Sequence, residues 1–350
     1  MSAPIFVVGY MHSGTTLLLN ILKNHPDLYC AEEETKFFMH LGLVRRQLGD
    51  AASADDAILE YCRYVVERGV PFRTEDQAKL PIQPAPDGRW SHLSDIEIGR
   101  GFRAALDTIA REAGKTRWVE KTPTHVFNVE IITAAIPDVT FLEIARDPRD
   151  ILASKKSRKD TAWSDKLPPE RRARRRLDQS FDPLWDGLSW KSAIRAGASG
   201  RRAMPQRWTR IRYEDLVVDP DGVTKQVCAA LDLAFDPTLL DVSRGIPANF
   251  DERGSGERGV ASTSVGRWRD VLTSTELAVC RLACRREMDQ LGYATDGESA
   301  SIAAAFGAIA TRSLPEFIDR ALARYRMGGT AYLREVAAGY VRRLRKLARR

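Results

Sequence analysis

The chain has 350 residues, of which 43% are hydrophobic, and a formal net charge of +7. This length and composition can bury a large core, which excludes a disordered protein and fits one large α/β domain with additions or two small domains. No stretch approaches the roughly 18 apolar residues of a membrane-spanning helix, and the first ten residues lack the features of a secretory signal. We therefore expect a cytoplasmic protein. Five scattered cysteines predict reduced thiols and no disulfide framework.

The first predicted elements are a strand, a glycine loop and a helix. An apolar run over residues 5–8 precedes Gly9, and Gly14 precedes an apolar helical pattern that begins at Leu17. The spacing is that of a phosphate-binding P-loop, G-x-x-x-x-G-K-[ST], except that Thr15 stands where the lysine is expected. Backbone N–H groups at such a turn bind an anion with the help of the helix dipole, although a tight turn without a ligand has the same pattern. Hydroxyl donors are available at Ser13, Thr15 and Thr16.

An acidic cluster, Glu32 to Glu34, follows the first helix and precedes two phenylalanines. The helix dipole favours acidic residues at a helix N-terminus, which is one interpretation of this cluster. Helical spacing then covers residues 54–67 and 96–112, and prolines interrupt the chain over residues 71–95. An irregular connection of that length is typical of a lid or a substrate loop.

Two more strands are predicted in the middle of the chain. One ends at Lys121, and a second, over residues 139–145, is followed by Arg146 and another helix. Strands that alternate with helices predict right-handed βαβ units and a parallel sheet. The second strand resembles a metal-binding P-loop strand, but its positive end suits an anion and not a metal ion. We therefore predict no metal site.

The last third of the chain continues this alternation. Residues 207–216 predict a strand with an acidic helix start, residues 244–260 a loop, and residues 274–291 a long helix. Residues 294–300 are small and polar, so we expect a domain over residues 1–293 and a helical extension over residues 294–350. The extension ends in a basic amphipathic helix that either packs on the domain or lies on an anionic membrane. Its apolar stripe contains Leu333, Val336, Tyr340, Leu344 and Leu347.

The ordered motifs resemble those of the sulfotransferases that use 3′-phosphoadenosine-5′-phosphosulfate (PAPS). In chain order they are the glycine loop, the acidic cluster with Phe-Phe, and Lys-Thr-Pro at Lys121, followed by Arg-Asp-Pro at Arg146, Tyr-Glu-Asp-Leu at Tyr213 and Gly-x-Trp at Gly266. The resemblance covers residues 4–293. It implies a three-layer, P-loop-like α/β fold with a central parallel sheet flanked by helices. It also implies transfer of a sulfuryl group from PAPS to a hydroxyl, without a metal.

The resemblance implies a role for each motif in binding the nucleotide. The glycine loop holds the 5′-phosphosulfate, Arg146 and Ser154 hold the 3′-phosphate, and Tyr213 lies near the adenine unless it is a core tyrosine. His12 stands where the family commonly has Lys or Arg, and would supply that charge when protonated. A late loop closes over the nucleotide, with Arg258 as a second ligand of the 3′-phosphate. The predicted nucleotide-binding residues are Gly9, His12, Ser13, Gly14, Thr15, Thr16, Arg146, Ser154, Tyr213, Arg258, Ser264, Arg267 and Trp268.

The resemblance also implies the catalytic residues. A sulfuryl group carries less charge than a phosphoryl group, so side chains can replace the metal and the loop lysine. The Glu-x-x-Phe-Phe form places the base at Glu34, whereas counting from the glycine loop without a gap places it at Glu33. Cytosolic members use a histidine in a Lys-Thr-His context, which makes His125 a further candidate. Lys121 is expected to donate to the sulfonate or bridging oxygen, and His12 to serve as the loop cation.

The acceptor is not specified by the motifs. Residues 71–95 and 161–187 are expected to line its site, and their arginines indicate an acidic or already sulfated acceptor. A hydroxyl of a glycan, a glycolipid or a small metabolite fits. The alternative enzyme is a Mg²⁺-dependent small-molecule kinase, which lacks its loop lysine and metal carboxylate here. Nucleic acid is not an expected partner, because the arginine runs have no interleaved aromatic residues. Peripheral contact with the inner membrane surface is expected to use the C-terminal helix.

Overall fold

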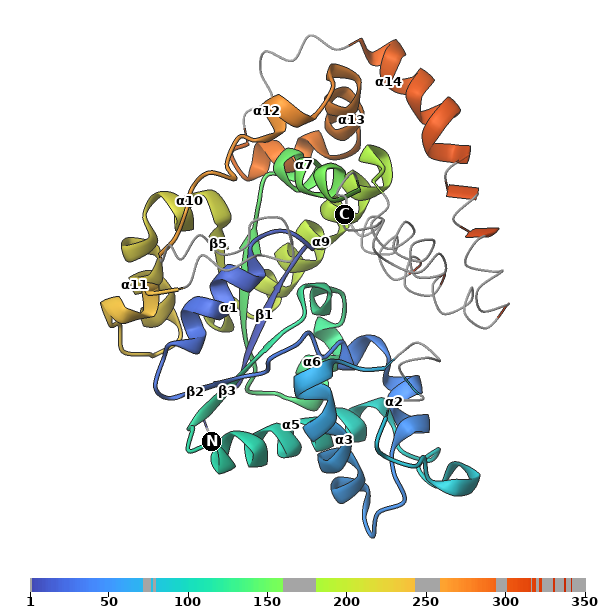
Figure 1. Cartoon of the computed structure of the whole chain (residues 1–350), viewed down its shortest axis with the longest axis vertical. Coiled ribbons are helices and arrows are strands. Elements are labelled where there is room, and N and C mark those ends of the chain that lie inside the picture. The colour runs from blue at the N-terminus through green and yellow to red at the C-terminus, as the bar shows by residue number, and fades with distance from the viewer. Residues whose placement is uncertain are drawn as a thin grey trace.

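The computed structural model describes residues 2–71, 77, 80–159, 181–242, 259–293 and 301–315, and seven single positions beyond them (317, 318, 321, 322, 330, 337 and 341). Its centre is a five-stranded sheet in the order β2-β3-β1-β4-β5, in which every paired strand is parallel (Figure 1). The predicted α/β fold with a central parallel sheet is confirmed. The strands are β1 (Ile5–Gly9), β2 (Leu28–Cys30), β3 (Arg117–Lys121), β4 (Thr140–Ala145) and β5 (Trp208–Arg212).

Helices cover both faces of the sheet and make three layers. Alternate residues of a strand point to opposite faces, so Ile5 and Val7 join one core while Phe6 and Val8 join the other. All residues of β1, β3 and β4 are buried, as expected of central parallel strands. The first core contains α1 (Thr15–Lys23), α10 (Tyr213–Val218) and α11 (Pro220–Ala230). The second contains α2 (Leu41–Gln47), α3 (Ala54–Arg68), α5 (Asp95–Glu112), α6 (Val129–Ala135) and α9 (Pro183–Ala203).

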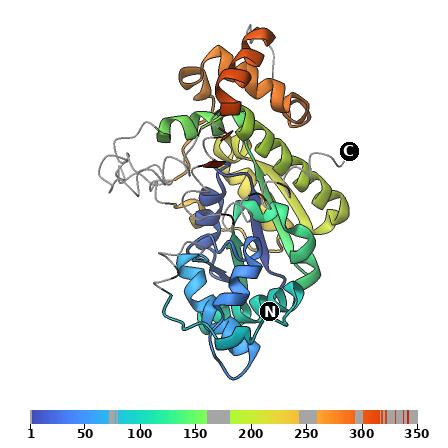
Figure 2. The same ribbon diagram turned by 90° about the vertical axis from the view of Figure 1, so that its right-hand side faces the viewer.

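The remaining helices gather beyond one end of the sheet, as Figures 1 and 2 show. They are α7 (Pro148–Lys159), α12 (Trp268–Val271), α13 (Ser274–Gln290) and α14 (Ile302–Ala308), which continues into a π turn, Ile309–Ser313. The helix α13 packs on α9 and α14 packs on α13. No helix in the described part of the chain is long and apolar enough to cross a membrane.

The register of the sheet brings the carboxyl ends of its strands together. Gly9 lies beside Ile144, Ala145 lies beside Arg212, and Val7 lies beside Lys121. Open parallel sheets bind ligands at this edge, where successive connections leave in opposite directions. The glycine loop after β1 therefore lies between the segments that follow β3 and β4.

Candidate active site

The glycine loop needs both of its glycines. A Cβ on Gly9 would lie 2.5 Å from the carbonyl oxygen of Ile144, and a Cβ on Gly14 would overlap the ring of Tyr213. Gly14 has a φ of +97° and is the N-cap of α1, and no described side chain caps that helix. The first N–H groups of α1 have no partner within the helix, so this turn has the geometry of an anion site.

The predicted hydroxyl donors of the loop differ in their surroundings. Ser13 is buried, and its Oγ donates to the carbonyl oxygen of Tyr10, which folds the loop back on itself. Thr15 is buried at the first helical position, whereas Thr16 is exposed. The three hydroxyl-bearing residues of the loop therefore differ in their exposure to solvent.

Arg146 ties the glycine loop to a segment more than a hundred residues later. Its Nη1 donates to the carbonyl oxygen of His12 at 3.0 Å, and its Nη2 donates to that of Ser264 at 2.8 Å. The guanidinium lies over the ring of Tyr213, 4.2 Å from its centroid. Among the described residues, Arg146 Nε is buried and has no hydrogen-bond partner. One guanidinium thus closes the loop and still carries a donor that an anion could take.

Ser154 and Arg146 both contact His12, at different atoms. Ser154 Oγ, on α7, lies 3.5 Å from His12 Nδ1. His12 has a left-handed backbone, with a φ of 67°, and its carbonyl oxygen accepts the hydrogen bond from Arg146. Sequence spacing alone does not bring a serine eight residues along a new helix back to the loop, whereas the fold does.

Asp150 binds the segment of residues 264–268, which also contacts Arg146. Its Oδ2 accepts a hydrogen bond from Gly266 N at 2.8 Å, and its Oδ1 accepts one from Trp268 N at 3.0 Å. Burial raises the pKa of Asp150, and these two backbone hydrogen bonds offset only part of that rise. The Gly-x-Trp motif is therefore an anchoring point in this structure.

The remaining predicted nucleotide ligands are placed in different ways. The Trp268 ring contacts two guanidinium groups, those of Arg149 at 4.2 Å and Arg269 at 4.4 Å from its centroid. Arg267 is exposed at the start of α12. Arg258 lies outside the described residues.

Tyr213 is packed against the loop. Its ring touches Gly14, one face lies under Arg146, and its hydroxyl is 2.5 Å from Ser264 Oγ. Tyr213 is 7% exposed. The placement favours a buried tyrosine that supports Arg146 over a ring face open to adenine.

The acidic cluster and Lys121 meet at the carboxyl end of β3. Lys121 Nζ donates to Glu34 Oε1 at 3.0 Å, and about a third of the Glu34 side chain is exposed. Glu33 is exposed, and Glu32 pairs with Lys23 at 2.7 Å. Of the three glutamates, Glu34 is the one that joins the predicted cation.

A buried carboxylate, Glu120, lies directly behind this pair. It accepts hydrogen bonds from Thr35 Oγ1 at 2.7 Å and Thr122 Oγ1 at 2.6 Å, and lies 2.8 Å from His125 Nδ1. Burial alone would raise the pKa of Glu120, but the charge and hydrogen bond of His125 and the two hydroxyls outweigh it and lower that pKa. Because Thr35 follows Glu34 and Thr122 follows Lys121 in the sequence, Glu120 holds the backbone beside both residues.

His125 belongs to the core. It is fully buried, its ring packs beside Phe6 and Phe38, and in the described part of the chain its Nε2 has no hydrogen-bond partner. A base must reach the acceptor hydroxyl, so this placement does not support His125 as the base. It supports Glu120 instead.

Three supports of the site were not identified from the sequence. They are Asp150, Glu120 and the buried ion pair of Lys155 on α7 with Asp186 on α9. Asp186 also lies 3.5 Å from the hydroxyl of Tyr10 in the loop. Each contact joins segments that are far apart in the chain, so no local sequence pattern predicts it. The second aspartate of "DPRD" and the glutamate before Lys-Thr were the available signals.

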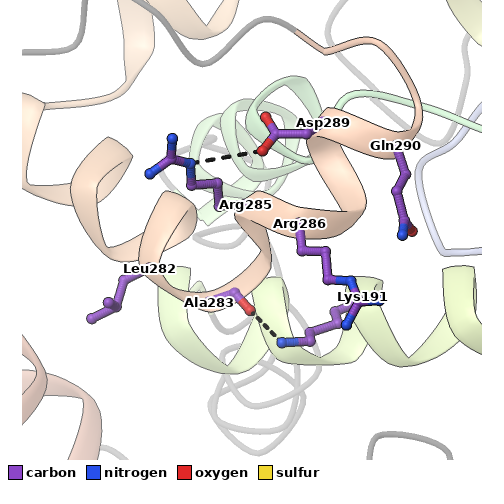
Figure 3. Close-up of a pocket in the computed structure, with 7 residues that line it drawn as sticks. All are labelled: Lys191, Leu282, Ala283, Arg285, Arg286, Asp289 and Gln290. Atoms are coloured by element: carbon purple, nitrogen blue, oxygen red, sulfur yellow. Dashed lines mark hydrogen bonds and ion pairs between the residues drawn. The ribbon is translucent and has the colours of Figure 1, made fainter. Parts of the chain in front are cut away.

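A hollow of ≈ 590 Å³ lies elsewhere, between α9 and α13 (Figure 3). There Lys191 Nζ donates to the carbonyl oxygen of Ala283, and Arg285 pairs with Asp289. No predicted site residue lines it. The described residues also hold no group of three or more His, Cys, Asp or Glu side chains that could bind a metal ion. The hollow is lined by Lys191, Leu282, Ala283, Arg285, Arg286, Asp289 and Gln290.

A model of the sulfotransferase family matches residues 4–237, two thirds of the chain. The chain belongs to the sulfotransferase family. Nodulation protein NoeE of Sinorhizobium fredii is 27% identical over 307 residues, which cover 82% of this sulfotransferase and 65% of that protein. Omega-hydroxy-beta-dihydromenaquinone-9 sulfotransferase Stf3 of Mycobacterium tuberculosis is 30% identical over 120 residues, 32% of this chain and 28% of that protein. Protein-tyrosine sulfotransferase A of Caenorhabditis elegans is 23% identical over 237 residues, 67% of this chain and 51% of that protein. The chain thus spans less than two thirds of the length of these relatives.

Solved structures share the fold of this sulfotransferase. The sulfotransferase domain of the Synechococcus PCC 7002 olefin synthase superimposes with a TM-score of 0.52 at 19% identity, covering 84% of this chain and 97% of that domain. The sulfotransferase domain of the curacin biosynthetic pathway gives a TM-score of 0.50 at 18% identity, covering 84% and 99%. At these identities the likeness concerns the fold. The predicted P-loop-like sulfotransferase fold is confirmed.

Proposed function

We propose that this sulfotransferase moves a sulfuryl group from PAPS to a hydroxyl of a glycan, a glycolipid or a small metabolite, with Glu34 as the base and no metal. The observation that carries the proposal is the contact set of Arg146, which joins His12 in the glycine loop to Ser264 in the late segment. These contacts of Arg146 lie at the same edge of the sheet as the Glu34–Lys121 pair. Two anion-binding elements and a carboxylate with a cation are what sulfuryl transfer to a hydroxyl needs.

The residues present fit a doubly phosphorylated nucleotide. Among the described residues, Arg146 Nε is a buried donor without a partner, and the N-terminus of α1, which no side chain caps, offers backbone N–H groups beside glycines that leave no room for a Cβ. We assign the 5′-phosphosulfate to the glycine loop and α1, and the 3′-phosphate to Arg146 and Ser154. When bound, the donor supplies a sulfuryl group on a phosphate leaving group.

The residues proposed to catalyse the transfer lie at the carboxyl end of β3. Glu34 accepts the proton of the acceptor hydroxyl, which requires its carboxylate form. Lys121 has three N–H donors, so it can keep Glu34 oriented and still donate to an oxygen that gains charge during transfer. Glu120 fixes the chain on both sides through Thr35 and Thr122, which limits the orientations of the pair.

The acceptor class follows from the shared chemistry of the family. The name of Stf3 specifies a hydroxylated menaquinone and that of protein-tyrosine sulfotransferase A a tyrosine, so both relatives are named for hydroxyl acceptors of very different size. We infer a hydroxyl acceptor for this chain too. A Mg²⁺-dependent kinase is less well supported, because Thr15 replaces the loop lysine and Arg146 ends the strand where a metal carboxylate is expected.

The test combines donor binding with product detection. The full chain is titrated with 3′,5′-adenosine bisphosphate by calorimetry, and is then incubated with PAPS and cell extract in EDTA while mass spectrometry records added sulfate. We expect saturable binding and products heavier by one sulfate in EDTA. Transfer that needs ATP and Mg²⁺ and stops in EDTA would establish the kinase instead.

A further inference from the structure

A row of large apolar side chains is exposed along α14 and the residues that follow it. Residues 301–310 contain no charged side chain, and most of them are exposed. Contiguous exposed apolar surface is uncommon on a monomer and marks an interaction site. The row consists of Ile302, Phe306, Leu314, Ile318 and Leu322, which are between 47% and 68% exposed.

The π turn Ile309–Ser313 brings the side chains before and after it toward the same side of the segment. Residues twelve apart in an α-helix, such as Ile302 and Leu314, lie about 120° apart around its axis. A π turn holds more residues per turn, so it shifts the phase of all residues after it and brings the two halves of the row closer together.

The other side of this segment already has a partner. Ala305 and Ser313 are buried, the carbonyl oxygen of Ser313 accepts a hydrogen bond from Trp185 Nε1 at 3.2 Å, and Phe317 stacks on the Trp185 ring at 4.6 Å. Intramolecular packing therefore uses one face of the segment. The exposed row is a second apolar face.

The charge of the chain is concentrated in the same region of the sequence. Residues 301–322, which hold the row, contain two Arg, one Glu and one Asp and are neutral overall, whereas residues 323–350, which follow the row directly in the sequence, contain nine Lys or Arg and one Glu, a net charge of +8. Because the whole chain has a net charge of +7, residues 1–300 together carry −1. An apolar row followed by a basic segment matches an anionic bilayer, where the apolar side chains enter the headgroup boundary and the basic ones meet lipid phosphates.

We propose that the exposed row of Ile302, Phe306, Leu314, Ile318 and Leu322 is a membrane-contact surface that holds this protein on anionic lipid. Charge complementarity selects this occupant, because a second copy of the chain would bring two segments of net charge +8 together. The helix α14, which carries Ile302 and Phe306, lies at the same end of the molecule as α7 and α12, which carry Ser154 and Trp268 (Figures 1 and 2). A lipid-borne hydroxyl at the bilayer surface would thus be near the transfer site.

Vesicle co-sedimentation tests the surface without donor or acceptor, so its outcome is independent of the proposed chemistry. The full chain is mixed with vesicles of phosphatidylcholine alone or with phosphatidylglycerol added. Two variants, Phe306→Asp and Ile318→Asp, place a charge in the row. The matched control is Val218→Asp, at an apolar residue on α10 that is 75% exposed.

We expect the wild-type chain and Val218→Asp to sediment with anionic vesicles, and each row variant to partition at least about tenfold less, since burial of a Phe or Ile side chain is lost. Circular dichroism checks that the variants are folded. Equal sedimentation of all four proteins, or none with anionic vesicles, overturns the proposal. A wild-type dimer in light scattering that both row variants convert to monomers would overturn it too, by assigning the row to a second copy.

Discussion

The two halves of the site are held together in different ways. At the ends of β1, β4 and β5, side chains act on backbone groups: Arg146 binds the carbonyl groups of His12 and Ser264, and Asp150 binds the amides of Gly266 and Trp268. At the ends of β2 and β3, side chains meet side chains around Glu120. In the proposed function, the first half shapes loops around an anion, and the second orients two reactive groups.

This difference separates the expected effects of mutation. Damage to the Arg146 half should weaken binding of the donor nucleotide and leave the chemical step intact once donor saturates. Damage to the Glu120 half should slow the chemical step and leave nucleotide affinity unchanged. Each variant is therefore measured twice, by kcat and by calorimetric Kd for 3′,5′-adenosine bisphosphate.

Glu34→Gln should have the largest effect. The amide cannot accept the acceptor proton, so kcat should fall about a thousandfold while the nucleotide Kd stays the same. Glu33→Gln is the matched control on an exposed neighbour and should keep most activity. The reverse result, with Glu33→Gln inactive and Glu34→Gln active, would move the base to Glu33.

Arg146→Ala should act on the other half. Its loss removes two charge-assisted hydrogen bonds and the buried Nε donor, so the nucleotide Kd should rise about 100-fold. At saturating donor, kcat should change little. Arg100→Ala, on the exposed side of α5, is the control and should match the wild type. An unchanged Kd in Arg146→Ala would remove Arg146 from the nucleotide site.

More of the first half of the site than of the second could be predicted from the sequence. The glycine loop, Arg146 and Ser154 are parts of local motifs, and alternating strands and helices predicted the sheet whose edge brings them together. Glu34 and Lys121 were found in the same way. His125 was weighed as a base because spacing cannot tell a buried ring from an open one, and the packing between Phe6 and Phe38 decides that.

The supports were missed for a related reason. Asp150 and Glu120 bind groups that are 116 and 85 residues away in the chain, at Gly266 and Thr35. Such contacts depend on tertiary packing, which no periodicity records. The pKa values of these two carboxyl groups also depend on tertiary packing, which lowers one and raises the other. The stabilities of Glu120→Gln and Asp150→Asn should therefore depend on pH with opposite signs.

Glu120→Gln should slow transfer about tenfold at an unchanged nucleotide Kd, because Thr35 and Thr122 lose a charged acceptor and the Glu34–Lys121 pair becomes less well oriented. The pKa of Glu120 is lowered in the folded state, so its contribution to stability is present above the unfolded value of about 4.3 and declines as the pH falls. Denaturant unfolding should show Glu120→Gln less stable by about 2 kcal/mol at pH 7, with the difference shrinking in acid. A rise in the nucleotide Kd with an unchanged kcat would place Glu120 in the other half of the site.

Asp150→Asn should have the smallest effect and the opposite pH dependence. An amide oxygen binds the Gly266 and Trp268 amides less strongly than a carboxylate, so the nucleotide Kd should rise about fivefold with kcat unchanged at saturating donor. Because burial raises the pKa of Asp150 above its unfolded value of about 3.9, its titration favours folding below that value, and this contribution is lost as the pH rises through the folded pKa. The stability of Asp150→Asn relative to the wild type should therefore increase as the pH rises, whereas that of Glu120→Gln should decrease. The exposed Asp221→Asn on α11 serves as the control for both measurements. If the stabilities of the two variants relative to the wild type changed with pH in the same direction, the two halves of the site would differ only in their contacts and not in their response to pH.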